Sequence, residues 1–435
     1  MIKIYRKKDI ILTGFALFAM LFGAGNLIFP PKVGFDVGEM WKAATLGFFI
    51  TGIGIPLLAI ISAAYAGKDL DDFANRVSPK FSKVFNVVLI LAIGPFLALP
   101  RTGATAYEMA ILPHTNGADV DMFKYIFLFI YFAVVLMFSI RANAVIERVG
   151  KVLTPILIII LAIIIVKGVF FPLGEPVVVE TMTNPFKYGF YNGYQTMDTL
   201  GAIVFSSIII KAIRNGRNLT VKQEMKFLSS SSIIAVCGLA VVYGGLLYIG
   251  ATSNGIFQGA KTTQLLNEIV DRMLGKSGNL ILGICVTGAC LTTAIGLTAT
   301  VGDYFSKLLN TTYEKVVIVT TIISFIFAGF GVDIIVKISA PILTLIYPIA
   351  IVLIILNFFK NKIKTNSIYV GAVVGASLVG AYEMAQVLSI NTSEILTVIY
   401  RSLPLNSFGL AWILPSIICA ISFKYMFKTR QNIYK

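Results

Sequence analysis

Apolar stretches long enough to cross a lipid bilayer recur along the whole chain, separated by short charged segments. A helix needs about 20 apolar residues to cross a hydrocarbon core of roughly 30 Å, and we count about twelve such stretches. Because 57% of the residues are hydrophobic and only 13% are charged, a water-soluble fold would expose large apolar patches. The sequence therefore predicts an all-α integral membrane protein with about twelve transmembrane helices. In chain order, the predicted spans cover residues 10–29, 43–65, 84–106, 123–140, 152–171, 190–213, 232–251, 280–301, 316–330, 334–359, 368–388 and 410–427.

Basic residues are unevenly distributed between the loops that join these spans. If the amino terminus lies in the cytoplasm, about 25 of the 36 Lys and Arg residues fall on the cytoplasmic side, as the positive-inside rule requires. The net charge of +15 therefore reflects membrane orientation and does not indicate nucleic-acid binding. We expect a multi-pass protein of the cytoplasmic (inner) membrane with both termini inside. The basic residues on that side include Arg141, Arg148, Lys151, Lys211, Arg214, Arg217, Lys222, Lys226, Lys360, Lys362, Lys364, Lys424, Lys428 and Arg430.

The cysteine and histidine residues give no sign of cross-links or metal ligation. Cysteines inside apolar spans behave as small hydrophobic residues, so we expect no disulfide. The only histidine, His114, falls in a predicted loop with no Cys or His nearby, so we expect no transition-metal site. The cysteines are Cys237, Cys285, Cys290 and Cys419.

Two of the apolar spans contain clusters of glycine, proline and polar residues. Residues 22–31 of the first span read Phe-Gly-Ala-Gly-Asn-Leu-Ile-Phe-Pro-Pro, and residues 191–201 of the sixth read Tyr-Asn-Gly-Tyr-Gln-Thr-Met-Asp-Thr-Leu-Gly. Lipid cannot satisfy unpaired backbone groups, so such breaks are tolerated where they line a cavity inside the protein. Breaks in spans one and six are those expected of a five-plus-five inverted repeat around a central site. Close helix packing is the alternative for Gly23 and Gly25, and it also explains Gly52, Gly54, Gly371 and Gly375.

A broken helix offers backbone groups of both polarities. Free N–H groups at a helix start attract anions, and free carbonyls at a helix end attract cations. We therefore expect the carboxylate of an amino acid on the first break, and its ammonium group on the carbonyls between Tyr191 and Tyr194. The predicted substrate-binding residues are Gly23, Ala24, Gly25, Asn26, Tyr191, Gly193, Tyr194, Gln195 and Thr196.

The eighth span carries a cluster of hydroxyl groups. Thr292 and Thr293 follow Ala289 within one helical turn. Hydroxyl and carbonyl oxygens are hard ligands of the kind that sodium prefers. Because threonine can also bond the carbonyl of its own preceding turn, the cluster by itself is a weak signal.

Ionisable residues also fall in the third and sixth spans, with Arg101 in the third, Glu108 seven residues after it, and Asp198 in the sixth. Buried charges in a membrane are functional candidates, so Arg101, Glu108 and Asp198 are candidates for gating or proton handling. A structural ion pair, Arg101 with Asp198 or with Glu108, is the alternative. Arg101 could also extend to the membrane surface.

Three motifs resemble the branched-chain amino acid:cation symporter family, which includes the BrnQ-type carrier proteins. They are Phe22-Gly-Ala-Gly-Asn-Leu-Ile-Phe-Pro-Pro31, Gly94-Pro-Phe-Leu-Ala-Leu-Pro-Arg-Thr102 and Gly193-Tyr-Gln-Thr-Met-Asp-Thr-Leu200. The resemblance covers essentially the whole chain and implies a LeuT-like fold of the APC superfamily, with discontinuous helices 1 and 6. It implies a ten-helix core over residues 1–360, with inverted repeats at roughly 8–172 and 184–360, and two additional helices in 361–435.

The resemblance also implies roles for individual residues. The stretch from Gly23 to Asn26 is similar to the unwound segment that holds the substrate carboxylate. Asn26 also matches a ligand of a second sodium ion in some relatives. The implied ligands of the shared sodium site are the backbone of Ala19 and Phe22, together with Ala289, Thr292 and Thr293.

Other classes of protein fit the sequence less well. A channel needs a continuous polar path, whereas the polar residues here concentrate at the middle of the membrane. We find no arrangement of catalytic residues and expect no enzyme activity. The run Gly275-Lys276-Ser277 resembles a phosphate loop, but Val270 stands where that motif requires glycine.

The sequence therefore predicts a secondary transporter that imports leucine, isoleucine and valine. Import would proceed by symport with Na⁺ or another monovalent cation through alternating access. The expected partners are the amino acid, the coupling cation and the lipid bilayer; we expect no cofactor, nucleic acid or obligate protein partner. A symporter for another neutral amino acid and a transporter-like membrane sensor are the alternatives.

Overall fold

The computed structural model describes residues 7–67, 70–115, 119–140, 144–214, 220–257 and 259–433, without the side chains of 144–155, 207–214, 221–222 and 427–433. These ranges hold helices and connecting turns and no β-strand. Several basic residues behind the orientation prediction fall outside this description, so the orientation stays a prediction. Arg141 and Arg217 lie outside the described residues, as do the side chains of Arg148, Lys151, Lys211, Arg214, Lys222, Lys428 and Arg430.

The helices follow the predicted spans in order. Seven helical stretches among the described residues are long and apolar enough to cross a membrane, and shorter apolar helices cover Ile156–Phe170 and Ile413–Met426. The α-helices are α1 (Lys7–Leu21), α2 (Ala24–Val37), α3 (Trp41–Phe49), α4 (Ile55–Ala66), α5 (Pro79–Leu91), α6 (Ala98–Ala110), α7 (Val120–Ile140), α8 (Ala144–Phe170), α9 (Pro185–Tyr194), α10 (Asp198–Arg214), α11 (Val221–Ser253), α12 (Thr262–Leu308), α13 (Tyr313–Ala328), α14 (Val332–Phe358), α15 (Asn366–Val387), α16 (Glu394–Ser402) and α17 (Ile413–Ile433).

The predicted breaks in the first and sixth spans are confirmed. The first span consists of α1 and α2, and the sixth consists of α9 and α10. The second span passes through a π-helical turn at Ile50–Gly54. The third span is kinked between α5 and α6, where the backbone of Gly94 is not helical. Large apolar side chains cover the outer surface, such as Phe170, which is 73% exposed. This surface is the one that a lipid bilayer would cover.

Glycines allow the backbones of several neighbouring helices to come into direct contact. A Cβ atom on Gly34 of α2 would stand 1.8 Å from the carbonyl oxygen of Leu247 on α11, and one on Gly47 of α3 would stand 2.1 Å from that of Phe186 on α9. Gly371 and Gly375 face the α17 backbone in the same way, so the helix-packing interpretation holds for them. These contacts fix α2 against α11 and α3 against α9.

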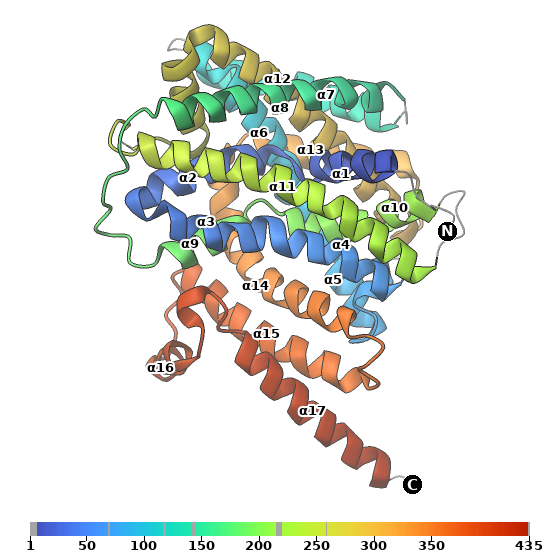
Figure 1. Ribbon diagram of the computed structural model, residues 1–435. Helices are drawn as coiled ribbons and strands as arrows, with labels where there is room; N and C mark the ends of the chain where they lie inside the picture. Colours follow the sequence, from blue (N-terminus) through green and yellow to red (C-terminus); the bar gives the residue numbers. More distant parts are fainter. Residues whose placement is uncertain are drawn as a thin grey trace.

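The two halves of each broken helix point toward different sides of the molecule (Figure 1). In this view α1 begins and α17 ends on the right, and we call this side the terminal face. On the left, α2 ends, α9 begins and α16 lies, and we call this side the opposite face. Helices α15 and α17 pack on each other and α15 packs on α14, at the bottom of the view.

Candidate functional site

The two breaks meet inside the protein through their side chains. Asn26, in the first turn of α2, donates from Nδ2 to Asp198 Oδ2 at 2.6 Å. Tyr243 of α11 accepts a hydrogen bond from the same Asn26 nitrogen and donates to Asp198 Oδ2 at 3.2 Å. Asn26 is 1% exposed, Asp198 7% and Tyr243 0%. An acidic side chain is thus enclosed between the breaks and is held by the neutral donors Asn26 and Tyr243.

Local chemistry explains why each helix stops where it does. The Asn26 Oδ1 atom reaches back to accept the Gly23 N–H at 3.0 Å, which satisfies one of the free donors at the start of α2. In the other break, Met197 has a positive φ of 60°, a conformation in which a helix cannot continue. Thr196 donates its hydroxyl to the Gly193 carbonyl at 2.9 Å and so closes the end of α9.

Arg101 of α6 lies between the two breaks. It is 3% exposed, and its Nη1 donates to the Gln195 carbonyl oxygen at 2.7 Å. Its guanidinium carbon lies 5.2 Å from the centre of the Phe29 ring. The predicted ion pairs with Asp198 and with Glu108 are not formed within the 4.0 Å limit of a salt bridge, because the carbonyl at the end of α9 receives the guanidinium instead. Arg101 is therefore a buried cation at the C-terminal end of a half helix.

A small cavity of about 60 Å³ lies where these elements meet. We call it the central cavity. Arg101 and Asp198 both line it, so it presents charges of both signs. Apolar side chains such as Phe205 and Leu297 complete its wall. The predicted site residues on its wall are Gly23, Ala24, Gly25, Asn26, Thr196 and Thr293, together with Arg101 and Asp198.

The structure does not bring all the predicted substrate residues to this cavity. Tyr191, Tyr194 and Gln195 line a second, larger cavity instead. Gly193 packs against the π-helical turn Ile50–Gly54 of the second span, where a Cβ atom would stand 1.9 Å from Thr51 Oγ1. The reason is that α9 continues through Tyr194, so the break begins at Gln195, after the predicted ammonium site at residues 191–194. The carbonyls of Asn192, Gly193 and Tyr194 accept N–H groups of the closing turn.

The threonines of the eighth span lie beside the first break. Thr292 and Thr293 donate their hydroxyls to the Ala289 carbonyl at 2.9 and 3.0 Å. The Thr293 methyl carbon stands 3.8 Å from where a Cβ atom on Gly23 would lie. Since the hydroxyls act as donors to Ala289, their oxygen lone pairs remain available to a cation. This donor set fits an alkali cation better than a transition metal.

The other half of the predicted sodium site belongs to the end of the first half helix. Ala19 lies in α1, two residues before its last residue, and Phe22 lies in the break. The Phe22 ring stacks on the Phe18 ring, with 5.2 Å between the ring centres. The ring offers no ligand atom to a cation, so the backbone carbonyl is the only candidate ligand that Phe22 supplies. Carbonyls in the last turn of a helix have no N–H partner within the helix and can bind a cation.

Glu108 lies at the end of α6 away from the two breaks. It accepts a hydrogen bond from Thr263 of α12 and another from the Val332 N–H of α14 at 2.9 Å. The Glu108 carbonyl accepts Asn267 Nδ2 at 3.1 Å. These contacts tie three helices together, and Glu108 also lines a cavity of about 540 Å³.

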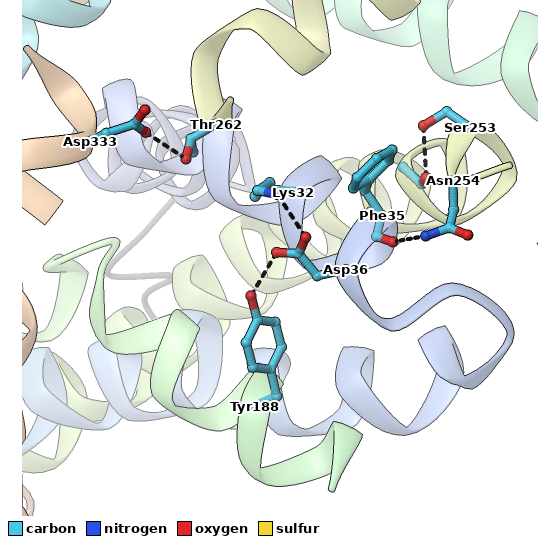
Figure 2. Close-up of polar contacts among 9 residues, drawn as sticks. Lys32, Phe35, Asp36, Tyr188, Ser253, Asn254, Thr262 and Asp333 are labelled. Atoms are coloured by element: carbon cyan, nitrogen blue, oxygen red, sulfur yellow. Dashed lines mark hydrogen bonds and ion pairs between the residues drawn. The ribbon is translucent and has the colours of Figure 1, made fainter. Parts of the chain in front are cut away.

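The outer halves of the two broken helices are also joined on the opposite face (Figure 2). Asp36 of α2 pairs with Lys32 at 2.6 Å and accepts the Tyr188 hydroxyl of α9 at 2.6 Å. Close by, Asn254, the residue after α11, donates to the Phe35 carbonyl. Helix α2 is therefore connected to both halves of the sixth span, to α10 at the breaks and to α9 at its far end.

Sequence reasoning missed Tyr243 and Ser339. Tyr243 stands in an otherwise apolar stretch of α11, and Ser339 of α14 donates to Gln195 Oε1 at 2.7 Å. A single polar residue in an apolar span carries no pattern of its own. Its role depends on contacts with residues far away in the sequence.

Comparison with known proteins gives consistent matches over the full length. The family model for "Branched-chain amino acid transport protein" matches residues 6–430. The branched-chain amino acid permease BraB of Bacillus subtilis is 39% identical over 420 residues, which are 95% of this chain and 94% of the permease. The branched-chain amino acid transport system 2 carrier protein of Pseudomonas aeruginosa is 36% identical over 417 residues, 95% of this chain and 94% of the carrier.

Solved structures match in fold. The transporter MhsT, solved with L-phenylalanine, is 16% identical with a TM-score of 0.59, covering 97% of this chain and 98% of its own. Mhp1 in an inward-facing conformation is 14% identical with a TM-score of 0.63, covering 97% of this chain and 91% of its own. The fold is therefore that of the LeuT-like transporters, as the resemblance implied.

Proposed function

Because the chain belongs to the branched-chain amino acid transport protein family, we propose that it imports leucine, isoleucine and valine by symport with a monovalent cation. It is a multi-pass membrane transport protein and not an enzyme. The cytoplasmic membrane is the proposed location, with the terminal face inside the cell and the opposite face outside. The proposal depends on one observation above all, the placing of Arg101 and Asp198 on one cavity between two broken helices.

A zwitterion complements the charges of the central cavity. The substrate carboxylate would bind the N–H groups at the start of α2, at Ala24 and Gly25, and the guanidinium of Arg101, whose buried Nε has no hydrogen-bond partner among the described residues. The ammonium group would bind the Asp198 carboxylate. This assignment replaces the carbonyls of residues 191–194, because those of Asn192, Gly193 and Tyr194 accept hydrogen bonds from their own turn. The aliphatic side chain would lie against Phe205 and Leu297.

Binding requires the cavity to enlarge. Its volume of about 60 Å³ is below the roughly 300 Å³ at which ligand pockets begin. On the opposite-face side it is closed by a layer in which Arg101 bonds Gln195, Gln195 bonds Ser339, and Tyr194 stacks on Tyr347 at 4.0 Å. Opening and closing of this layer around the broken helices is the alternating-access step we propose.

Sodium is the proposed coupling ion. Thr292, Thr293 and the carbonyls of Ala19, Phe22 and Ala289 supply oxygen atoms without a carboxylate, which suits a monovalent cation. One positive charge moving down ~100 mV releases about 2.3 kcal/mol, enough for about fiftyfold accumulation. A single coupled ion is thus sufficient for nutrient uptake.

Uptake into proteoliposomes tests the proposal. Labelled leucine should accumulate above equilibrium when an inward Na⁺ gradient is imposed, and unlabelled isoleucine and valine should compete with it. Gradients of Li⁺ or H⁺ serve as the ion controls, and glutamate and lysine as the substrate controls. Preferred uptake of another neutral amino acid would contradict the specificity, and binding without accumulation would favour the sensor alternative.

A further inference from the structure

The cavity of about 540 Å³ beside Glu108 shares no lining residue with the central cavity. We call it the polar cavity. It is formed by the end of α6, by the turn that follows α6, and by α12. The start of α12 lies on the opposite face, where Thr262 bonds Asp333 (Figure 2). The volume of the polar cavity falls in the range of roughly 300–1,000 Å³ that is typical of ligand sites.

The first part of α12, residues 262–274, turns a polar face toward this cavity. The polar side chains follow the i, i+3, i+4 and i+7 spacing that places residues on one side of a helix. Leu266 and Ile269 lie on the other side and are fully buried. The four residues of the polar face that line the cavity are Gln264, Asn267, Glu268 and Asp271.

A bend in α12 brings a second part of the helix to the same cavity. Gly275 has a φ of 73° and a ψ of −177°, which interrupts the helix. Lys276 and Asn279, from the part that follows the bend, also line the cavity. Both parts of α12 therefore contribute polar groups to one space.

Two buried amide oxygens in this wall lack a donor. Asn267 and Asn279 are each 5% exposed, and the Oδ1 atom of each has no hydrogen-bond partner among the described residues. The Asn267 Nδ2 atom is already used, because it donates to the Glu108 carbonyl at 3.1 Å. Buried acceptors are normally paired with a donor. A ligand with N–H groups would supply the donors that the wall lacks.

The charges of the wall are unbalanced in the same sense. Glu108, Glu268 and Asp271 carry carboxyl groups, whereas Lys276 is the one Lys or Arg among the described lining residues. Glu108 already accepts hydrogen bonds from two other helices. No salt bridge within the described part of the chain includes Glu268, Asp271 or Lys276. The excess of negative charge favours a cation.

The cation could be a metal ion or an organic amine, and two observations favour the amine. The residues that the structure describes include no group of three or more His, Cys, Asp or Glu side chains that could hold a metal ion. The cavity volume of about 540 Å³ is also far larger than the roughly 30 Å³ that one water molecule occupies in the liquid. A single ion would leave most of it unfilled.

We propose that the polar cavity binds an organic cation with two amino groups, a short aliphatic diamine. One ammonium group binds Glu268 and the other binds Asp271, whose Cβ atoms are about 5–6 Å apart at this helical spacing. The N–H groups of the ligand also donate to the Oδ1 atoms of Asn267 and Asn279. A bound diamine connects the end of α6 with both parts of α12, and so stabilises this conformation of the protein.

The test measures the binding of labelled putrescine, a four-carbon diamine. The full-length protein is placed in nanodiscs of phosphatidylcholine, a lipid without net charge, so that the membrane itself does not attract the diamine. Glu268→Gln and Asp271→Asn each remove one charge from an exposed position without a change in size. Glu314→Gln is the matched control, since Glu314 is exposed at the start of α13 and does not line the cavity. Leucine uptake equal to that of the wild type verifies that each variant is folded.

Glu268→Gln and Asp271→Asn should each weaken putrescine binding about tenfold or more, which is the loss expected for a charged hydrogen bond. Glu314→Gln should bind putrescine as the wild type does. n-Butylamine, which has one amino group, should bind the wild-type protein at least tenfold more weakly than putrescine. Putrescine should also raise the melting temperature of the wild type, because it binds the folded state.

Three results would overturn the proposal. The first is the absence of saturable putrescine binding to the wild-type protein. The second is equal binding by the wild type, Glu268→Gln and Asp271→Asn. The third is displacement of labelled putrescine by Ca²⁺ at lower concentrations than by unlabelled putrescine, which would assign the cavity to a metal ion. Each of these results is independent of leucine uptake in proteoliposomes, so the proposed transport function would stand.

Discussion

Arg101 on α6 lies so close to Gly25 on α2 that a Cβ atom at position 25 would stand 2.9 Å from Arg101 Nη2. The same atom would lie 3.3 Å from the Thr196 Cα in the other break. Because Arg101 is also bonded to the Gln195 carbonyl, its guanidinium cannot move away without losing that contact. Three separate parts of the chain therefore meet at a point with no room for a methyl group.

Gly25→Ala should reduce leucine uptake at least tenfold. The added methyl group would displace Arg101 from the end of α9, and overpacking of this kind typically destabilises a protein by about 1–3 kcal/mol. Gly296→Ala is the matched control, since a Cβ atom on that α12 glycine meets nothing within 4 Å. Uptake and melting temperature are measured together. Equal uptake by the two variants would contradict the close packing at Gly25.

Asp198→Asn should abolish concentrative uptake. The amide keeps the size of the side chain, and its oxygen can still accept from Asn26 and Tyr243, but it cannot pair with a substrate ammonium group. Loss of a charged hydrogen bond corresponds to about 1.5–3 kcal/mol, so leucine affinity should fall about tenfold to a hundredfold. Binding is measured on the purified protein in nanodiscs.

Asp333→Asn is the control for this change, because Asp333 accepts from Thr262 at 3.0 Å on the opposite face, away from the central cavity. Its leucine affinity should match that of the wild-type protein. Wild-type affinity in Asp198→Asn would remove Asp198 from the substrate site.

The positions of both breaks could be predicted from sequence, because glycine and amide residues inside an apolar span leave a local pattern. Asn26 and Asp198 were both identified in this way. Their mutual contact, and the part of Tyr243 in it, could not be predicted, since nothing in the sequence of α11 distinguishes Tyr243 from the other tyrosine of that helix, Tyr248. Contacts across 172 positions depend on packing that one sequence does not reveal.

The partner of Arg101 was predicted less well. Two carboxylates, Asp198 and Glu108, were candidates, and the structure gives it a backbone carbonyl instead. The end of a half helix carries a partial negative charge that has no signature in the side-chain sequence. Tyr191 and Tyr194 were assigned to the central site for a different reason. The end of α9 could be placed from the sequence only to within a few residues.

Thr293→Ala should raise the Na⁺ concentration needed for half-maximal uptake. Removing the hydroxyl takes away one proposed oxygen ligand, and Thr292→Ala should act in the same direction. Thr300→Ala is the control, because its hydroxyl bonds the Gly296 carbonyl at 2.8 Å in the same helix but does not line the central cavity. Uptake is measured over a range of Na⁺ concentrations at fixed leucine. An unchanged Na⁺ dependence in both Thr292→Ala and Thr293→Ala would contradict the proposed cation site.

Glu108 should matter for stability more than for coupling. Glu108→Ala removes the acceptor of the Thr263 hydroxyl and of the Val332 N–H, and each buried donor left without a partner is expected to destabilise the protein by about 1–3 kcal/mol. The melting temperature of the purified protein should therefore fall. Glu108→Gln keeps an oxygen that can accept one of these bonds, so its melting temperature should lie between those of the wild type and Glu108→Ala. If Glu108 instead carried a proton during transport, Glu108→Gln would fold normally and lose the pH dependence of uptake, and this result would contradict the structural role.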